Sequence, residues 1–555
     1  MSTLGVHRDA DAHEASPPRD APIGLRLALA AEAWPEREAL VFEETRLTFA
    51  QLGAWHESVA SFLCDAHVEP GDRVLWQLPN LPDALALHLA ILRMGAVSMP
   101  VPMLYRQHEL THIVREAKPA AVITVGAYRG RDPISDLGSV LAEQGVHPKL
   151  LGSVGSSAGR WAELPACGDL RGTHNRARLP RPLDGEEPVL ILYTSGSTAN
   201  PKGVVHSSAS LNNLAFVMRD WFGFSPADRF ITGAPVAHIA GLLITGIVPL
   251  VCGATAVLMA QWDPVVATQL ADKERATFSC GATVFLQEFV ETYETGPPVS
   301  HPLSMFMCGG ATISPDLIER AERVGVCAFR SWGMTEAPTI GLATVQDQLD
   351  MRARTDGRIC PGAEVEAVDH RRRPLGRGRE GELRVRAGQR MIGYTDPALN
   401  DILIDRDGWY YSGDTGIVSS DGCVTMTGRI KDIINRGGEK FSAQDIENVV
   451  MTHPAVRAAA ILAVADRRLG EEVACFVQLQ SDADWPGAEA LYAHLDASHL
   501  ARQKFPKYWQ VVDALPLTAS GKVKKDVLLR IWEAQTPPKH NEAAGSKKLP
   551  EPKKQ

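Results

Sequence analysis

The residues from Tyr193 to Gly203, which read YTSGSTANPKG, follow an apolar run and combine small, hydroxylated side chains with a lysine. Backbone N–H groups in such a loop can converge on an anion, hydroxyl groups add donors, and Lys202 supplies a point charge. The Walker A pattern is not met, because Pro201 stands where it needs glycine and Gly203 follows the lysine. The loop predicts phosphate binding by another architecture, with a Ser/Gly-rich surface turn as the alternative.

Four further segments place polar side chains in turns between apolar runs. Alone, each carries little information: a Thr-Glu pair is usually surface, an aspartate beside glycine usually closes an Asx turn, and a lysine among lysines usually lies on a solvated face. Their order on one chain, behind the hydroxylated loop, is what gives them weight. The segments are 331-SWGMTE-336, 411-YSGDTG-416, 428-GRIKDIINRGGEKFSAQDIE-447 and 517-LTASGKVKK-525.

Together these segments resemble the signatures of the adenylate-forming superfamily of acyl-CoA synthetases, aryl-acid ligases, nonribosomal peptide adenylation domains and luciferases. The resemblance extends over roughly residues 25 to 530. One departure is Ala199, where the family usually has glycine; it stiffens the loop without removing its donors. The resemblance implies that a carboxylate attacks the α-phosphate of ATP, giving acyl-AMP and pyrophosphate, and that a thiol then takes the acyl group.

The resemblance also implies a nucleotide site. Lys202 and the hydroxylated loop would hold the β- and γ-phosphates, and Thr335 would touch the α-phosphate. Glu336 and Thr198 would bind Mg²⁺, a hard cation suited to carboxylate and phosphate oxygens. The implied ATP/AMP-binding residues are Thr194, Ser195, Gly196, Ser197, Thr198, Lys202, Gly309, Gly310, Ala311, Trp332, Gly333, Met334, Asp414 and Arg429.

Within that set, Asp414 would accept hydrogen bonds from both ribose hydroxyls, assisted by Arg429. The turn 309-GGA-311 and Trp332 resemble the adenine slot, where an aromatic face covers the base. Most relatives carry tyrosine at the position of Trp332, and the substitution preserves stacking.

By the same resemblance, Lys522 is the lysine that bridges the attacking carboxylate and the α-phosphate. Lys431 falls at the family's hinge, where rotation of the C-terminal domain would withdraw that lysine after the first step and present a thiol tunnel for the second. The implied catalytic residues are Lys522, Glu336, Thr335 and His238, and the implied CoA/thiol tunnel residues are Gly437, Gly438, Glu439 and Lys440.

The acyl pocket is implied beside 235-PVAHIAG-241. His238 resembles a position on the path to the carboxylate and the CoA tunnel, although a buried structural histidine remains an alternative. Catechol-siderophore aryl-acid ligases usually have His-Asn here, whereas this chain has Ile239, and a buried hydroxyl left unpaired by it would cost about 1–3 kcal/mol. This favours an apolar acid. The implied pocket residues are His238, Ile239, Gly241, Thr283, Val284 and Gly333.

These side chains must be positioned by an α/β fold. Helical stretches such as 82–95, read as amphipathic, alternate with β-rich runs such as 120–125 and 188–193, which predicts parallel sheets covered on both faces. Gly246, Pro249 and Gly253 break the apolar run 239–260 into a helix, a turn and a strand rather than a membrane span.

Four parts are predicted along the chain. A large AMP-binding and acyl-pocket domain of layered sheets and helices precedes a small, mobile α+β domain that carries the catalytic lysine. Polar ends with little to bury should be disordered. The predicted bounds are 1–24 for the N-terminal disordered segment, 25–430 and 431–535 for the two domains, and 536–555 for the tail.

The composition indicates which kinds of partner the protein binds. A net charge of −9, with 45% hydrophobic residues, gives no footprint for nucleic acid, so small molecules are expected. The nine cysteines are scattered singly, which predicts reduced thiols in a cytoplasmic protein.

The function expected first is an ATP-dependent carboxylic acid–CoA ligase using ATP, Mg²⁺ and coenzyme A, similar to short- and medium-chain fatty-acyl and cyclohexanecarboxylate-type ligases. The alternatives are a stand-alone aryl- or acyl-adenylating enzyme that loads a carrier protein, and a catalytically silent nucleotide- or acyl-binding homologue. Which acid is used, and whether the protein is a homodimer, stays open.

Overall fold

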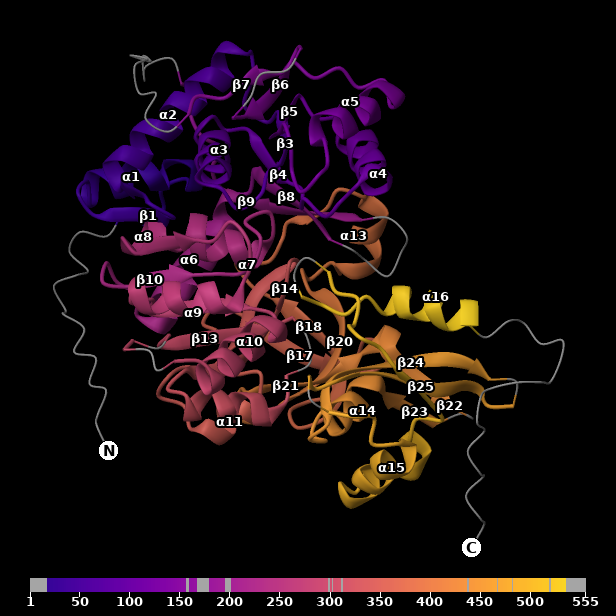
Figure 1. Ribbon diagram of the computed structural model, residues 1–555. Helices are drawn as coiled ribbons and strands as arrows, with labels where there is room; N and C mark the ends of the chain where they lie inside the picture. Colours follow the sequence, from indigo (N-terminus) through magenta and orange to yellow (C-terminus); the bar gives the residue numbers. More distant parts are fainter. Residues whose placement is uncertain are drawn as a thin grey trace, which may run out of the picture.

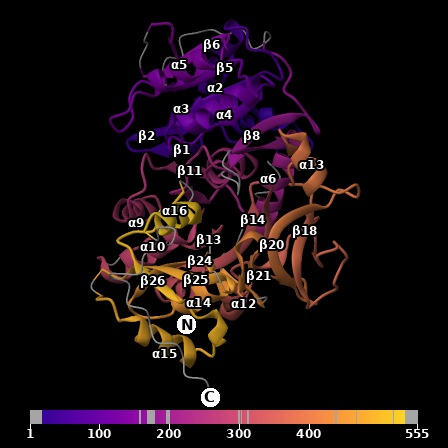
Figure 2. The same cartoon turned by 90° about the vertical axis from the view of Figure 1, so that its right-hand side faces the viewer.

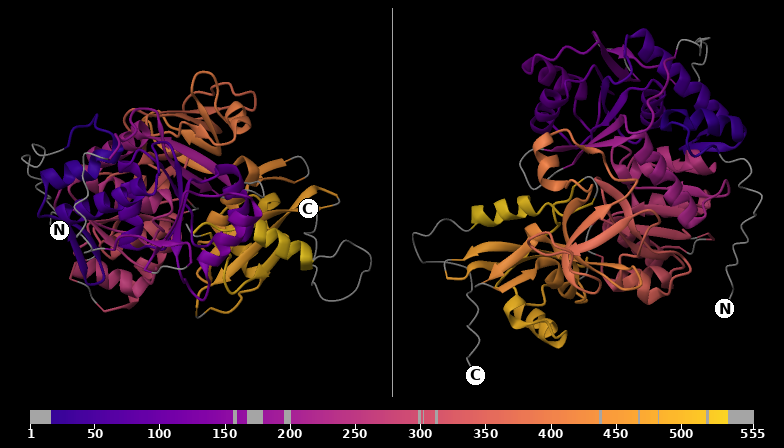
Figure 3. Two further views of the ribbon diagram at one scale, coloured as in Figure 1. Left: turned by 90° about the horizontal axis from the view of Figure 1, so that it is seen from above. Right: turned by 180° about the vertical axis from the view of Figure 1, so that it is seen from behind.

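The computed structural model describes residues 17–155, 159–166, 179–194, 201–297, 300–301, 303–310, 313–436, 439–466, 468–481, 483–518 and 521–535. It is a mixed α/β protein with a large N-terminal domain and a smaller C-terminal domain, which confirms the predicted fold class (Figure 1). The C-terminal domain lies against one side of the rest (Figure 3, right). Most of the two predicted disordered ends lies outside the described residues, and the domain boundaries stay predictions.

The first large sheet occupies the upper part of Figure 1. Its strands from β8 to β7 run parallel, whereas β9 and β19 are antiparallel additions at one edge. Within the described residues its order is β19 (Gly393–Tyr394), β9 (Lys202–Ser207), β8 (Pro188–Thr194), β4 (Val97–Pro100), β3 (Arg73–Gln77), β5 (Ala121–Val125), β6 (Leu150–Val154), β7 (Ala162–Glu163).

The second large sheet has a parallel centre from β14 to β1 and antiparallel strands at both edges. Within the described residues its order is β16 (Arg358–Ile359), β15 (Ala337–Leu342), β14 (Cys327–Met334), β13 (Met305–Gly309), β12 (Phe278–Gly281), β10 (Arg229–Ile231), β11 (Thr255–Leu258), β1 (Glu38–Phe42), β2 (Thr45–Thr48).

Alternating side chains of both sheets enter different hydrophobic clusters, so each sheet is covered on both faces. In β3, Val74 and Trp76 pack towards the helices between the sheets, and Leu75 packs towards the outer helices. The prediction of covered parallel sheets is confirmed. The helices of this domain are α1 (Arg26–Ala33), α2 (Phe49–Asp65), α3 (Pro82–Arg93), α4 (Gln107–Ala117), α5 (Pro133–Glu143), α6 (Ser208–Phe222), α7 (Ile239–Leu242), α8 (Pro249–Cys252), α9 (Pro264–Lys273), α10 (Thr283–Thr295), α11 (Pro315–Arg323), α12 (Leu349–Arg354) and α13 (Pro397–Leu403).

Two local predictions need correction. The helix α3 is buried on nearly all sides rather than amphipathic, because it lies in the layer between the two sheets and is apolar around its circumference. In the run 239–260, the helical path continues through Gly246 and Pro249 by a π-helical turn and ends only at Gly253, which is left-handed with φ 71°. No helix within the described part of the chain is long and apolar enough to cross a membrane.

Two smaller sheets complete the chain, and Figure 2 shows the first of them, antiparallel throughout, at the right-hand edge. The C-terminal sheet has its own hydrophobic clusters. The antiparallel sheet consists of β17 (Glu364–Val368), β18 (Glu380–Arg386), β20 (Tyr410–Val418) and β21 (Val424–Arg429). The C-terminal domain consists of β22 (Ile433–Arg436), β23 (Glu439–Ser442), α14 (Ala443–Val450), β24 (Val456–Asp466), β25 (Gly470–Leu479), α15 (Ala488–Ala497), β26 (Tyr508–Val511) and α16 (Lys525–Gln535).

Candidate active site

The site residues gather where the parallel strands β10, β12, β13 and β14 of the second large sheet end. Register pairs Gly281 with Cys308 and Gly309 with Ser331, so these strands finish side by side. The carboxyl edge of a parallel sheet is where such folds bind ligands. The predicted segments around 238 and 283 follow β10 and β12, and those around 309 and 332 lie in the last residues of β13 and β14, so the ends of the strands bring them together.

The turn after β13 has no room for larger side chains. A β-carbon on Gly309 would lie 2.7 Å from Ser331 Oγ. Gly310 has φ 82°, which favours glycine, and a β-carbon there would lie 3.0 Å from Lys522 Cε. The lysine predicted to be catalytic therefore lies against this turn, although it is distant in the sequence. Ala311 lies outside the described residues.

The loop that carries Lys522 is closed by its own hydrogen bonds. The Thr518 N–H donates to the Lys522 carbonyl at 2.7 Å, and the Lys522 N–H donates to Thr518 Oγ1 at 3.0 Å. Gly521 packs against the start of α10, because a β-carbon on it would lie 2.8 Å from both Ala282 Cβ and Val284 Cγ1. These contacts seat a C-terminal loop on the N-terminal domain.

Desolvation and the nearby Arg429 guanidinium lower the pKa of Lys522 to about 8. The carboxylates of Asp414 and Glu336 act in the opposite direction. Lys522 therefore shares one electrostatic environment with the residues predicted to bind ribose and metal.

His238 also faces this lysine. It precedes α7, and its Nδ1 is buried with no hydrogen-bond partner among the described residues. Burial, with a smaller effect of Lys522, lowers the pKa of His238 to about 4, so the imidazole is neutral at neutral pH. A buried nitrogen without a partner costs free energy unless a ligand or water pairs with it.

Glu336 accepts a hydrogen bond from one tyrosine, which in turn lies beside a second. Tyr394 Oη donates to Glu336 Oε1 at 2.8 Å and lies 3.1 Å from Tyr410 Oη. Burial and the Glu336 charge raise the pKa of Tyr394, which keeps its hydroxyl protonated as a donor. The sequence did not indicate these tyrosines, because they lie on β19 and β20, outside the motif.

Asp414 is 5% exposed and has donors on both oxygens. Arg429 Nε lies 3.0 Å from Asp414 Oδ1, as expected for partners opposite each other on β20 and β21. The indole Nε1–H of Trp332 donates to Asp414 Oδ2 at 3.0 Å. The sequence did not indicate this second contact. Trp332 is 4% exposed, and its role as a cover for adenine stays a prediction.

Thr335 is fixed through its carbonyl, which lies 2.8 Å from His206 Nε2. His206 is fully buried in β9, and burial lowers its pKa to about 4. A neutral imidazole that donates through Nε2 thereby ties the strand after the phosphate loop to the Thr-Glu segment. Sequence reasoning missed His206, although it lies only a few positions beyond Lys202.

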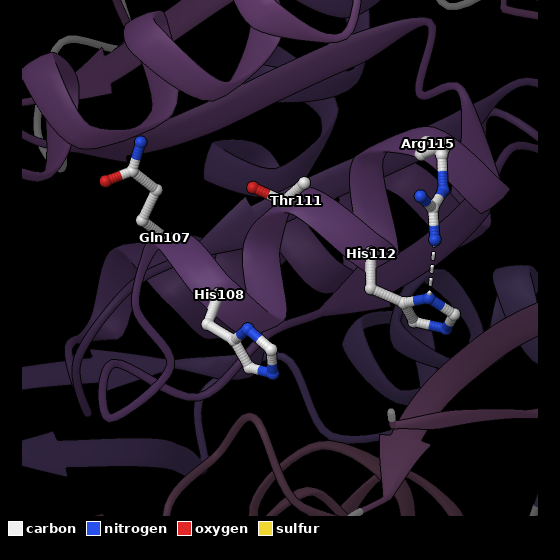
Figure 4. A pocket seen from close by; sticks show the side chains of 5 residues that line it. All are labelled: Gln107, His108, Thr111, His112 and Arg115. Carbon is white, nitrogen blue, oxygen red and sulfur yellow. Dashed lines mark hydrogen bonds between the residues drawn. The ribbon is translucent and has the colours of Figure 1, made fainter. Parts of the chain in front are cut away.

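Thr194 and Lys202 pair opposite each other at the ends of β8 and β9. The predicted phosphate ligands Ser195, Gly196, Ser197 and Thr198 lie outside the described residues. Helix α4 contacts both ends of this loop: His112 Nε2 lies 3.1 Å from the Pro201 carbonyl, and Tyr193 Oη donates to Glu116 at 3.1 Å. Figure 4 shows His112 on α4, beside a surface cavity of about 460 Å³.

At several positions predicted to line the acyl pocket, packing against neighbouring atoms explains the residue type. Ile239 is 7% exposed and packs in the core between the sheets. A β-carbon on Gly241 would lie 2.2 Å from the Pro235 carbonyl oxygen, and one on Gly333 would lie 2.5 Å from the Thr339 nitrogen. Thr283 and Val284 begin α10, and Met334 ends β14. Their roles in binding an acid or a nucleotide stay predictions.

Lys431 lies in the short turn Ile430–Asp432 that joins β21 to β22, a place suited to a hinge. Burial and Arg429 lower its pKa. Glu439 and Lys440 lie on β23, Glu439 exposed, whereas Gly437 and Gly438 lie outside the described residues. The hinge and the thiol tunnel therefore stay predictions.

This fold and this group of side chains are those of an adenylate-forming enzyme. The chain belongs to the AMP-binding enzyme family: the AMP-binding enzyme domain matches residues 27–395, and the AMP-binding enzyme C-terminal domain matches residues 445–522.

Named relatives share most of the chain. A medium-chain fatty-acid–CoA ligase of Escherichia coli (strain K12) is 30% identical over 507 residues, 90% of this chain and 88% of that protein. A salicylyl-CoA synthase / salicylate adenylyltransferase of a Streptomyces species is 32% identical over 518 residues, 91% and 93% of the two chains. The crystal structure of ATP-bound MatB from Rhodopseudomonas palustris matches with a TM-score of 0.80 and 25% identity. The match covers 92% of this chain and 99% of that chain.

Proposed function

We propose that the protein is an ATP-dependent carboxylic acid–CoA ligase acting on an apolar acid. The observation that carries this proposal is the position of Lys522, which extends from the C-terminal domain to the Gly310 turn in the N-terminal domain. A half-buried lysine at this junction of the two domains, near Asp414 and Glu336, is suited to a reaction between anions there. The alternative of a silent homologue explains neither this lysine nor the anchored carboxylates.

In the first step, a carboxylate oxygen of the acid bonds to the α-phosphorus of ATP while the bond from that phosphorus to pyrophosphate breaks. Both reactants are anions, so positive charge at the junction lowers the barrier. Lys522 would supply it between the two, and Lys202 would hold the departing phosphates.

Asp414 would hold the ribose, and the Thr335 hydroxyl would bind the α-phosphate. Glu336 fits a Mg²⁺ ion, because Tyr394 orients its carboxylate at 2.8 Å and hard cations prefer such oxygens. Bound Mg²⁺ would neutralise phosphate charge.

In the second step, the thiol of CoA releases its proton to solvent, its sulfur bonds to the acyl carbon, and AMP leaves with the electrons of the broken C–O bond. Neutral His238 would hydrogen-bond the reacting carbonyl or thiol, and its Nδ1, which has no partner among the described residues, supports this role. For the thiol to enter, Lys522 must leave the cleft, and the turn at Lys431 is where rotation would occur.

The preference for an apolar acid rests on Ile239 in place of a polar partner for a ring hydroxyl. The medium-chain fatty-acid–CoA ligase relative supports it. A second candidate, an acyl- or aryl-adenylating enzyme that loads a carrier protein, is supported by the relative named both salicylyl-CoA synthase and salicylate adenylyltransferase. Against salicylate, an unpaired buried hydroxyl would cost about 1–3 kcal/mol.

The test is to incubate the protein with ATP, Mg²⁺ and butyrate, octanoate, cyclohexanecarboxylate, benzoate or salicylate, with and without CoA, and to identify products by mass spectrometry. We expect an acyl-CoA from one of the apolar acids and little from salicylate. Acyl-AMP that persists despite CoA would favour carrier loading. Absence of nucleotide turnover with every acid would overturn the proposal and restore the silent homologue.

A further inference from the structure

We propose that Trp332 is a positioning residue for ribose recognition, acting through Asp414. The contact that points to this is the hydrogen bond from the indole Nε1–H to Asp414 Oδ2, 3.0 Å long between two buried side chains. The proposal rests on the proposed function, in which Asp414 binds the ribose hydroxyls.

The Trp332 side chain is held in place by its packing. Its ring is 4% exposed and packs in the hydrophobic cluster that joins β14 and β15 to the four-stranded sheet. Its neighbour Ser331 points the other way along the strand, and its hydroxyl donates to the Cys308 carbonyl beside the Gly309 turn. The Ser331 and Trp332 side chains therefore lie on opposite faces of β14.

The Asp414 carboxylate can accept further hydrogen bonds from a ribose while it stays bound to Arg429 and Trp332. Each carboxylate oxygen can accept about two hydrogen bonds. Arg429 occupies one position on Oδ1 and Trp332 one on Oδ2, both at 3.0 Å. One position on each oxygen remains, which matches the two hydroxyls of a ribose.

The two donors differ in how firmly they are held. Arg429 has 38% of its side chain exposed and immediately precedes the turn that leads into the C-terminal domain. Trp332 belongs to the core of the N-terminal domain. If the C-terminal domain rotates between the two steps, Trp332 is the donor that keeps Asp414 in place throughout, so that the adenylate stays bound while the thiol enters.

The decisive variant is Trp332→Phe, which removes the N–H and keeps an aromatic ring. We expect Kd for AMP and KM for ATP to rise about tenfold, the usual scale for losing a hydrogen bond to a charged group. With 2′,3′-dideoxy nucleotides, which lack both hydroxyls, variant and parent should differ less than twofold. Trp221→Phe is the matched control: its indole donates to the Ala343 carbonyl at 3.3 Å, away from the site, and binding should not change.

Equal losses with ribo- and dideoxynucleotides would overturn the proposal, because the effect of Trp332 would then not pass through the ribose hydroxyls. Calorimetric titration with AMP and dideoxy-AMP measures this without turnover, so the inference can hold even if no acid is activated and the proposed function fails. Should Trp332→Phe not fold, Asp414→Asn in the parent gives the second arm: AMP and dideoxy-AMP must then bind alike. If Asp414→Asn keeps the preference for AMP, Asp414 is not the ribose ligand and the inference falls.

Discussion

The two sides of the cleft are built differently. On the N-terminal side, Asp414, Thr335 and Glu336 belong to strands or strand ends, and each is tied to a side chain from another element. On the C-terminal side, Lys522 lies on a loop closed mainly by its own backbone and by Thr518. The residues proposed to hold the nucleotide through both steps are fixed in the packed N-terminal domain. Lys522, which is needed only for the first step, is delivered by the C-terminal domain.

The interface between the two domains fits this division. Gly521 packs against Ala282 and Val284 at the start of α10. Farther along the same helix, Arg457 of β24 lies 3.2 Å from Glu291. A partly exposed ion pair adds only about 0.2–1 kcal/mol. Such an interface can hold one orientation of the domains and still release it.

On the N-terminal side of the site, the largest effect is expected from a change of Glu336. Glu336→Gln removes the proposed metal ligand while keeping the shape, and we expect acyl-AMP formation to fall about a hundredfold or more, because the metal contributes several kcal/mol. Single-turnover assays at increasing Mg²⁺ measure this. Tyr394→Phe, which frees the carboxylate without removing it, should have a smaller effect in the same direction. Glu319→Gln, on α11, is the control; equal activity of the Glu336 variant and this control would remove Glu336 from the metal site.

The charge on Lys522, which the C-terminal domain contributes, should affect how kcat/KM depends on pH. Because the pKa of Lys522 is lowered to about 8, the free enzyme loses the lysine charge above that pH. kcat/KM for acyl-AMP formation should therefore fall above pH 8, approaching about tenfold per pH unit. In Lys522→Arg, which stays charged, the remaining activity should lack this limb. If kcat/KM falls above pH 8 in both proteins, the fall is due to the titration of a group other than Lys522.

The smallest expected effect concerns the interface. Arg457→Ala removes the ion pair with Glu291, so the observed orientation should become less populated and acyl-AMP formation should slow roughly two- to fivefold. Transfer from supplied acyl-AMP to CoA should stay the same or rise. Arg320→Ala breaks a comparable pair with Glu294, 2.6 Å apart, within the N-terminal domain and should change neither rate. Parallel losses in both rates would show that Arg457 acts through stability.

The sequence indicated the turns at the strand ends where the candidate site lies, because short segments rich in glycine, serine and threonine between apolar runs are typical of turns. It did not predict the contacts behind them. The Trp332–Asp414 and His206–Thr335 hydrogen bonds join residues far apart in the chain and depend on how two sheets meet. Likewise, α3 shows helical spacing, but only its place between the sheets makes it buried on nearly all sides.

The most direct measurement compares the two half-reactions in the parent and in Lys522→Ala. From acid and ATP, the variant should form acyl-AMP about a thousandfold more slowly, the scale of removing a group that stabilises developing charge. From supplied acyl-AMP, it should form acyl-CoA at the rate of the parent. Equal loss of both half-reactions would contradict the account, because Lys522 would then not be the group that the C-terminal domain delivers for adenylation alone.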